Sequence, residues 1–307
     1  MIETNDLSKQ FGDFWAVDGI TITVKPGQVL ALLGQNGAGK TTTVRLLTSL
    51  LSPSRGSAKI HGYDVVKEPD KVRSLVGVLT EQHGLYLRMT GLDYLDYFGQ
   101  IYRIDASTRV SRSLDLLELF GLENAALQRI GEYSKGMRQK LALARTLIHE
   151  PPVLLFDEPT SAMDPESARL VRDSISSLRS TNRSIIICTH NLSEAESLAD
   201  HIAIVYNGHI LISGQFEELK RKILGPVEYE IKISGEWPTD AIELPSGVEM
   251  VKNEIHSRRF QVEDPCKANP QLIMTLIRKK VEIISVYEVP RSLEQVYLKV
   301  MEQVRNA

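Results

Sequence analysis

The sequence predicts an α/β domain followed by a small α+β domain, and three observations carry that prediction. Short apolar runs alternate with longer helical stretches from Met1 to about Gly225, a pattern typical of a largely parallel core sheet. A period-two alternation of apolar and polar residues begins at Val227, which indicates a new sheet. The 307 residues, 42% hydrophobic and 24% charged, suffice for a large and a small domain. We therefore place the domains at 1–225 and 226–307.

In the first domain, the most apolar runs predict buried strands, and the segment between them predicts helices. The runs are Val29 to Leu33, Val153 to Phe156 and Ile185 to Cys188. From Leu85 to about Arg129 there is no strong strand candidate; one helical stripe ends at Tyr102, and a helix from Ser107 to Phe120 stops at Gly121. We expect a helical subdomain at about 85–150.

In the second domain, the expected order is strand, strand, helix, strand and helix. The segments are Val227 to Ile233, Arg258 to Glu263, about Pro270 to Lys280, Val281 to Glu288, and a last helix that begins after Ser292. Ser292 with Gln295 three residues later forms the pattern of a capping box. The apolar stripe of this last helix predicts core packing.

Charge and cysteine content exclude several classes of protein. A net charge of −3 gives no basic field, so no nucleic-acid partner is expected. Cys188 and Cys266 lie far apart without metal-ligand spacing, which excludes a zinc site and fits a reducing cytosol. The first six residues lack the features of a secretion signal, and every apolar run is far shorter than the roughly 18 residues that span a bilayer.

The strand Val29 to Leu33 runs directly into a complete G-x-x-x-x-G-K-[ST] motif, the P-loop. Its glycines let backbone N–H groups and the next helix N-terminus face phosphates. Lys40 supplies a charge at the β- and γ-phosphates, and Thr41 a hydroxyl for Mg²⁺. We therefore expect ATP and Mg²⁺ at Gly34, Asn36, Gly37, Ala38, Gly39, Lys40, Thr41 and Thr42.

Another buried strand ends in two acids, Asp157 and Glu158. Two carboxylates are costly in a core, so we expect them at the mouth of the strand, facing the P-loop. Asp157 is then the Mg²⁺ ligand through water, and Glu158 polarises the attacking water. Without the P-loop, the pair would be read as a solvated strand end.

Three further segments follow in an order that identifies a family. Tyr133-Ser134-Lys135-Gly136-Met137 precedes a helix, Ser161-Ala162-Met163-Asp164 follows the two acids, and the run from Ile185 ends at His190. With the P-loop, this set resembles the nucleotide-binding ATPase subunit of ATP-binding cassette (ABC) transporters, from Met1 to about Gly225.

The resemblance implies a P-loop NTPase of the ABC type and assigns further residues. Ser134, Lys135 and Gly136 would form the signature segment, Asp164 would lie in the D-loop, and His190 would be the switch histidine. Phe11 would stack on adenine, with Trp15 as a nearby alternative.

Two positions depart from the family pattern. Glu81 falls where the family usually has a glutamine at the hinge of the helical subdomain, and a shift of one residue would put Gln82 there instead. A carboxylate at this hinge adds negative charge near Mg²⁺ and removes a donor. Lys135 stands where glycine is commonest.

The resemblance also implies partners and a function. Two cassettes, either two copies or this chain with a related one, would pair head to tail around ATP. The helical subdomain would dock on a separate membrane permease at the inner face of the cell membrane, so that the ATPase is a peripheral cytoplasmic subunit. The C-terminal segment from Tyr287 to Leu298 resembles exporter ATPases of the ABC-2 type, which serve drug, antibiotic or polysaccharide permeases. The alternative is a soluble ABC ATPase without a membrane partner, such as a translation or DNA-maintenance factor.

Overall fold

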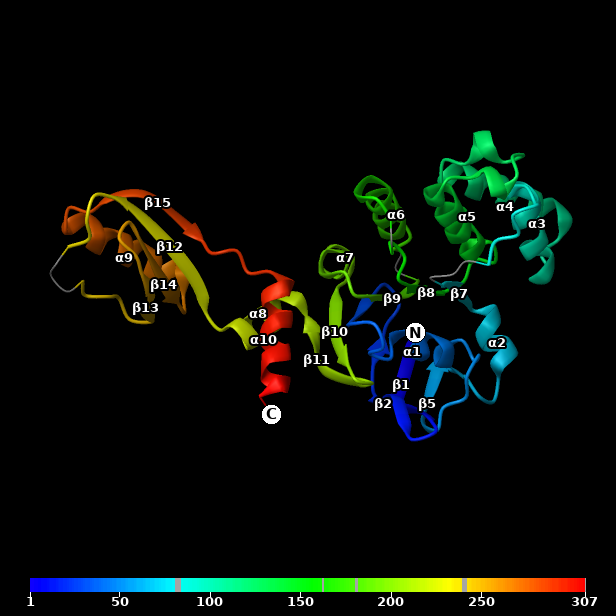
Figure 1. Ribbon diagram of the computed structural model, residues 1–307, viewed down its shortest axis with the longest axis horizontal. Coiled ribbons are helices and arrows are strands. Elements are labelled where there is room, and N and C mark those ends of the chain that lie inside the picture. The colour runs from blue at the N-terminus through cyan, green and yellow to red at the C-terminus, as the bar shows by residue number, and fades with distance from the viewer. Residues whose placement is uncertain (81–83, 162, 180–181, 239–241, 307) are drawn as a thin grey trace. The chain divides into compact units, whose positions relative to one another are not determined.

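The computed structural model describes residues 1–306 except 81–83, 162, 180–181 and 239–241. The chain divides into two compact units, Met1–Phe216 and Glu217–Ala307 (Figure 1). The division falls at the first residue of helix α8 (Phe216–Leu224), upstream of Gly225, where we placed the boundary from the sequence.

A six-stranded sheet forms the middle of the first unit, and its five neighbouring strands from β10 to β7 run parallel. Strand β11 pairs antiparallel with β10 through a turn at Asn207 and Gly208, whose positive φ angles of 46° and 82° suit a two-residue hairpin. The three strands predicted from apolar runs are confirmed. In sheet order the strands are β11 (His209–Gln215), β10 (His201–Tyr206), β4 (Val29–Leu33), β9 (Ser184–Thr189), β8 (Val153–Asp157) and β7 (Val76–Leu79).

Both faces of this sheet are buried, which explains why its strands read as continuous apolar runs. In β8, Leu154 and Phe156 pack into a core that includes the helices, whereas Val153 and Leu155 pack into a second core on the other face. Helix α1 (Lys40–Leu47) contributes Val44 to this second core.

A second, antiparallel sheet completes the core that surrounds α1. The sequence pattern did not predict it as a separate sheet, because bulges interrupt the pairing of β1 with both neighbours and blur the alternation of buried residues. Its strands are β2 (Phe14–Ile20), β1 (Ile2–Phe11), β5 (Arg55–Ile60) and β6 (Tyr63–Asp64), and β3 (Thr23–Val24) also pairs with β1. Helix α2 (Pro69–Ser74) follows β6.

The expected helical subdomain is present as α3 (Gly91–Ile101), α4 (Ala106–Leu119) and α5 (Lys135–Leu147), which group together in Figure 1. Thr90 and Asp105 cap the N-termini of α3 and α4. Gly121 follows the C-terminal end of α4 and has a φ of +64°. Two more helices, α6 (Pro165–Ser177) and α7 (Leu192–Leu198), follow β8 and β9 along the chain. Among the described helices, none has the length and apolar character needed to cross a bilayer.

The second unit is a four-stranded antiparallel sheet with helices, as the α+β prediction requires. The sheet order is β13 (Val248–Asn253), β14 (Ser257–Val262), β12 (Val227–Ser234) and β15 (Glu282–Glu288). Strand β13 was missed because five of its six residues are exposed, so that no alternation marks it. The last helix, α10 (Leu293–Arg305), begins with the predicted capping box.

Helix α9 (Pro265–Arg278) corrects one sequence prediction. The helix was expected to begin at about Pro270, yet it begins at Pro265, a position where the missing N–H of proline costs nothing. Pro270 lies inside it and removes one helical hydrogen bond. Burial of Leu272 and Leu276 against the sheet offsets that loss.

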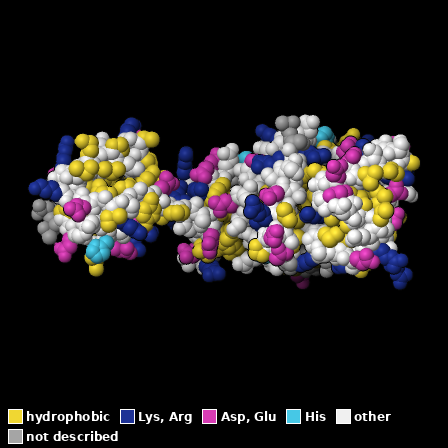
Figure 2. Space-filling model, turned by 90° about the horizontal axis from the view of Figure 1, so that it is seen from above, with side chains coloured by type: hydrophobic (Ala, Val, Ile, Leu, Met, Phe, Trp, Pro, Cys, Tyr) yellow, Lys and Arg dark blue, Asp and Glu magenta, His cyan; other side chains and the backbone are white. Residues whose placement is uncertain are grey.

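Not all apolar side chains of the second unit enter its core. Figure 2 shows hydrophobic side chains on the surface of this unit, at the left of the view. Among the exposed ones are Met274 and Ile277 on α9 and Ile284 on β15. Its sheet and helix therefore keep apolar surface in contact with solvent.

Candidate nucleotide-binding site

The P-loop lies between β4 and α1, and close backbone packing explains its glycines. A Cβ atom at Gly34 would lie 2.3 Å from the carbonyl oxygen of Val205 on β10. Gly39 has a φ of +106°, and a Cβ there would lie 2.4 Å from the carbonyl oxygen of Ala16 on β2. The loop can therefore fit between these two strands only with glycine at both positions.

Lys40 is the buried cation at the centre of the site, with 5% of its surface exposed. Its Nζ donates hydrogen bonds to the carbonyl oxygens of Gly34, at 2.6 Å, and Gln35, at 3.1 Å. It also forms an ion pair with Glu158 Oε1 at 3.3 Å. A buried ammonium needs such partners, and together they hold the charge at the inner wall of the loop.

A hollow of about 350 Å³ opens over the P-loop. Its lining brings together most of the residues predicted to hold ATP, and it adds two that the sequence analysis missed, Phe14 and Ala16. The lining residues are Phe14, Ala16, Asn36, Gly37, Ala38, Gly39, Lys40, Thr41, Thr42 and Glu158.

Phe11 and Trp15 do not line this hollow. Phe11 pairs with Phe14 across the β1–β2 hairpin, and the Nζ of Lys9 lies 5.3 Å from the centre of its ring. The guanidinium of Arg55 lies 5.6 Å from the Trp15 ring centre. Phe14, 61% exposed, is the aromatic side chain at the hollow. The sequence shows three aromatic residues within five positions, and this pattern does not tell which of them lies at the hollow.

A second hollow, of about 380 Å³, is lined by both Thr41 and Asp157. Asp157 ends β8 and is 3% exposed. A hydroxyl and a carboxylate oxygen on one small hollow are hard oxygen ligands of the kind that Mg²⁺ prefers, so these two residues fit the ion.

Glu158 and His190 meet at the carboxyl ends of two adjacent parallel strands, β8 and β9. The His190 Nδ1 and Glu158 Oε2 atoms are 2.8 Å apart. The Glu158 backbone has a φ of +51°, and its N–H donates to the carbonyl oxygen of Cys188 at 2.8 Å. This left-handed conformation, uncommon for a residue with a side chain, turns the chain sharply at the strand end and directs the carboxylate toward both Lys40 and His190.

The signature residues form the start of α5, away from the lining of the P-loop hollow. Ser134 caps the helix, and its Oγ accepts from the Met137 N–H at 3.2 Å. A Cβ at Gly136 would lie 3.2 Å from Ser167 Oγ on α6. Lys135, next to them, is exposed.

Asp164 caps α6 and accepts from the Ser167 N–H at 2.9 Å. The N–H and hydroxyl donors of Ser167 hold the pKa of the Asp164 carboxyl below its usual range. Ser134 and Asp164 thus cap two neighbouring helices, α5 and α6. Glu81 and Gln82, the two candidates for the hinge, lie outside the described residues.

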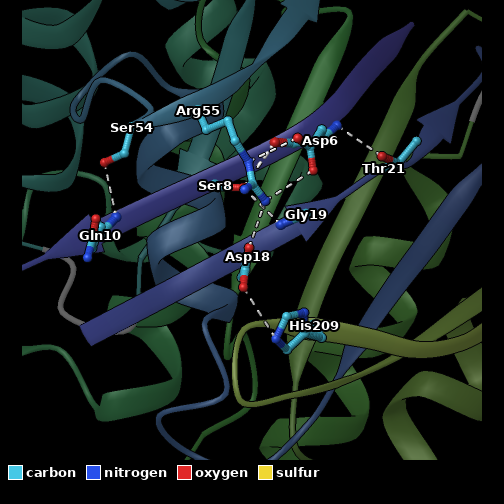
Figure 3. A network of polar contacts seen from close by, with 9 residues as sticks. All are labelled: Asp6, Ser8, Gln10, Asp18, Gly19, Thr21, Ser54, Arg55 and His209. Atoms are coloured by element: carbon cyan, nitrogen blue, oxygen red, sulfur yellow. Dashed lines mark hydrogen bonds and ion pairs between the residues drawn. The ribbon is translucent and has the colours of Figure 1, made fainter. Parts of the chain in front are cut away.

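Polar contacts join strands β1, β2 and β5 of the antiparallel sheet to His209 on β11 (Figure 3). Arg55 on β5 forms ion pairs with Asp6 on β1 and Asp18 on β2, both at 3.0 Å. His209 Nε2 lies 3.5 Å from Asp18 Oδ2. The Asp18 N–H donates to the Gly208 carbonyl, and the Gly208 N–H donates to the carbonyl of Ala38 in the P-loop. The β10–β11 turn is thereby hydrogen-bonded to the P-loop.

Comparison with known proteins places two sequence families on the chain. The family described as ABC transporter matches residues 17–161. The family described as ATP-binding protein DrrA1-3-like, C-terminal domain, matches residues 214–301.

Two similar proteins cover different shares of this chain. The ABC transporter ATP-binding protein NatA of Bacillus subtilis is 39% identical over 224 residues, 71% of this chain and 91% of NatA. The daunorubicin resistance ATP-binding protein DrrA3 of Streptomyces coeruleorubidus is 34% identical over 298 residues, 97% of this chain and 94% of DrrA3. Among solved structures, a dimeric ATP-binding cassette in a post-hydrolysis state with ADP and Pi shares the fold, with a TM-score of 0.63 and 23% identity, over 70% of this chain and 98% of that one.

Proposed function

Since this chain belongs to the ATP-binding subunits of ABC transporters, we propose that it drives export through a separate membrane permease by closing and opening a head-to-tail dimer. As a member of that family it binds and hydrolyses ATP. The observation that carries the proposal for the site is the contact of Lys40 and His190 with one carboxylate, Glu158, beside the P-loop.

Nucleotide phosphates would bind where the P-loop N–H groups and the α1 N-terminus point. Lys40 would exchange its ion pair with Glu158 for contacts to the β- and γ-phosphates. The released Glu158 carboxylate would accept a proton from the attacking water and increase its nucleophilicity. His190, 2.8 Å from that carboxylate, would hold it in position. Thr41 and Asp157 would hold Mg²⁺, which neutralises charge on the phosphate oxygens.

The signature segment supports the dimer part of the proposal. Ser134, Lys135 and Gly136 form a helix N-terminus, which favours an anion, yet they do not line the P-loop hollow of their own chain. We propose that they face the γ-phosphate of a partner cassette, with Asp164 nearby. ATP would then hold two cassettes together, and its hydrolysis would release them. The partner is a second copy or a related chain.

Export and membrane attachment rest on the relatives. DrrA3, whose name assigns it to daunorubicin resistance, aligns with nearly the whole chain, including the second unit. We propose that the helical subdomain, with exposed side chains such as Tyr86 and Leu87, docks on a permease at the inner face of the membrane.

The test uses the Glu158→Gln variant. An amide cannot accept the proton from water, so this variant should bind ATP without hydrolysing it, and a dimer should accumulate on a sizing column with ATP. Pulled down with ATP from detergent-solubilised native membranes, the variant should bring a polytopic membrane protein in stoichiometric amount.

The matched control carries Lys40→Ala in addition. Because it should bind ATP on the order of tenfold to a hundredfold more weakly, it should form much less dimer at the same ATP concentration. A monomer of Glu158→Gln at millimolar ATP would refute the head-to-tail dimer. Co-purification of ribosomal or DNA-bound material without a membrane protein would refute the transporter role.

A further inference from the structure

The short loop after Glu158 is held by two helices, one on each side. On one side, Gln139 of the signature helix α5 donates a side-chain hydrogen bond to the carbonyl oxygen of Pro159. On the other side, Thr160 Oγ1 donates to Glu194 Oε1 of α7 at 2.8 Å. The position of Glu158 therefore depends on side chains that lie outside the P-loop hollow.

Glu194 belongs to the turn that carries His190. Its backbone N–H donates to the side chain of Asn191, at 3.2 Å, and the Asn191 N–H donates to Thr189 Oγ1, at 3.0 Å. The residue directly between Thr189 and Asn191 is His190. Glu194 thus connects the loop that carries Glu158 with the turn that carries His190.

Glu194 is unusual because it is a carboxyl residue with 1% of its surface exposed. Burial raises the pKa of Glu194. Hydrogen bonds from the hydroxyls of Thr189 and Thr160 lower this pKa, the negative charge of Glu158 raises it further, and the charge of Arg172 on α6 lowers it. Burial of a carboxyl group costs stability that an apolar residue would not. Packing alone therefore does not account for a glutamate at this place.

We propose that Glu194 is a positioning residue for ATP hydrolysis: through Thr160 it sets the loop that carries Glu158 against the turn that carries His190. This inference rests on the proposed roles of Glu158 and His190. Glu194 itself does not line the P-loop hollow.

The kinetic consequence is specific. Glu194→Ala should lower kcat for ATP on the order of tenfold to a hundredfold, because a displacement of about 1 Å at a reacting group has an effect of that size. KM for ATP should change little, because the P-loop contacts remain. Glu194→Gln keeps the oxygen that accepts from Thr160, so it should recover most of the lost kcat.

Further variants distinguish the loss of the Thr160–Glu194 hydrogen bond from a general destabilisation of the protein. Thr160→Val removes the donor at nearly constant volume and should lower kcat as Glu194→Ala does. The double variant should be no slower than the slower single one, because both changes break the same hydrogen bond. Glu196→Ala, an exposed glutamate on the same helix, is the matched control and should keep the wild-type kcat.

The outcomes are decisive in either direction. Wild-type kcat for Glu194→Ala or Thr160→Val, equal losses for Glu194→Ala and Glu194→Gln, or a rise in KM without a fall in kcat would each overturn the proposal. If Glu194→Ala does not fold, Thr160→Val and Glu194→Gln decide the question alone. Glu158→Gln is assayed in parallel: if it keeps full turnover, the proposed site is wrong, whereas if it is inactive and Glu194→Ala is normal, only the role of Glu194 is wrong.

Discussion

Oxygen atoms of the P-loop and of Glu158 surround the charged group of Lys40. Two carbonyl oxygens and the carboxylate of Glu158 surround its Nζ within 3.3 Å. A triphosphate offers stronger and more numerous acceptors, so nucleotide binding amounts to a competition for this ammonium group. The carboxylate released in this competition is the one that we propose as the base in hydrolysis.

Lys40→Ala tests this arrangement. The variant should bind ATP on the order of tenfold to a hundredfold more weakly, since hydrogen bonds to a charged group contribute about 1.5 to 3 kcal/mol. Titration with a fluorescent ATP analogue measures the affinity, and Lys71→Ala, an exposed lysine on α2, is the control. Unchanged affinity would show that the P-loop residues are assigned wrongly.

At the scale of single elements, the helix α5 ends beside a histidine that titrates abnormally. His149 stacks on Tyr102 with 3.7 Å between ring centres, and its Nε2 lies 3.2 Å from the Val76 carbonyl oxygen. Burial lowers the pKa of His149 to about 4; the Val76 carbonyl opposes that effect, and the charge of Arg112 adds to it.

The sign of the resulting pH dependence follows from linkage. The folded state keeps His149 neutral, whereas the unfolded chain takes up a proton below about pH 6.5, so acid favours unfolding between about pH 6.5 and pH 4. At pH 5 the loss is about 2 kcal/mol relative to pH 7.5. His149→Phe keeps the stacked ring without the titration, so urea unfolding at both pH values should show a smaller loss. An equal loss in the variant would contradict this assignment.

Much of the site could be predicted because its motifs are local. The P-loop and the acids Asp157 and Glu158 each lie at one strand end, so a short stretch of sequence determines their place. Other features depend on distant parts of the chain. Thr160 and Glu194 are 34 positions apart and share no motif, and no pattern distinguishes Phe14, which lines the hollow, from Phe11 and Trp15, which do not.

Fold predictions failed where packing overrode local preference. The helix was expected to begin at about Pro270, yet buried side chains continue it on both sides of this proline. Strand β13 has one buried residue, Val248, so only its pairing with β14 identifies it. Periodicity predicts elements that bury a face, and β13 does not.

At the scale of the whole molecule, the chain carries separate cores in its two units. Every residue that lines the P-loop hollow belongs to the first unit, as do His190 and Asp157. The second unit contains none of the residues proposed for ATP binding. We therefore expect nucleotide binding to depend on the first unit alone.

Removal of Val227–Ala307 tests this independence. The shortened chain should fold and bind ATP with an affinity close to that of the full chain, because its cores and its P-loop are intact. Circular dichroism checks folding, and the fluorescent analogue measures binding. A folded but non-binding product would show that the second unit helps to build the site.

The left-handed backbone at Glu158 lowers the stability of the fold at a position where the proposed mechanism requires a carboxylate. A residue with a side chain in this conformation costs about 1 to 2 kcal/mol relative to glycine. A search that rewards only thermal stability would therefore favour glycine here and discard the carboxylate. Engineering of a more robust version of this ATPase must hold position 158 fixed, because glycine there would also remove the carboxylate partner of the buried Lys40 ammonium.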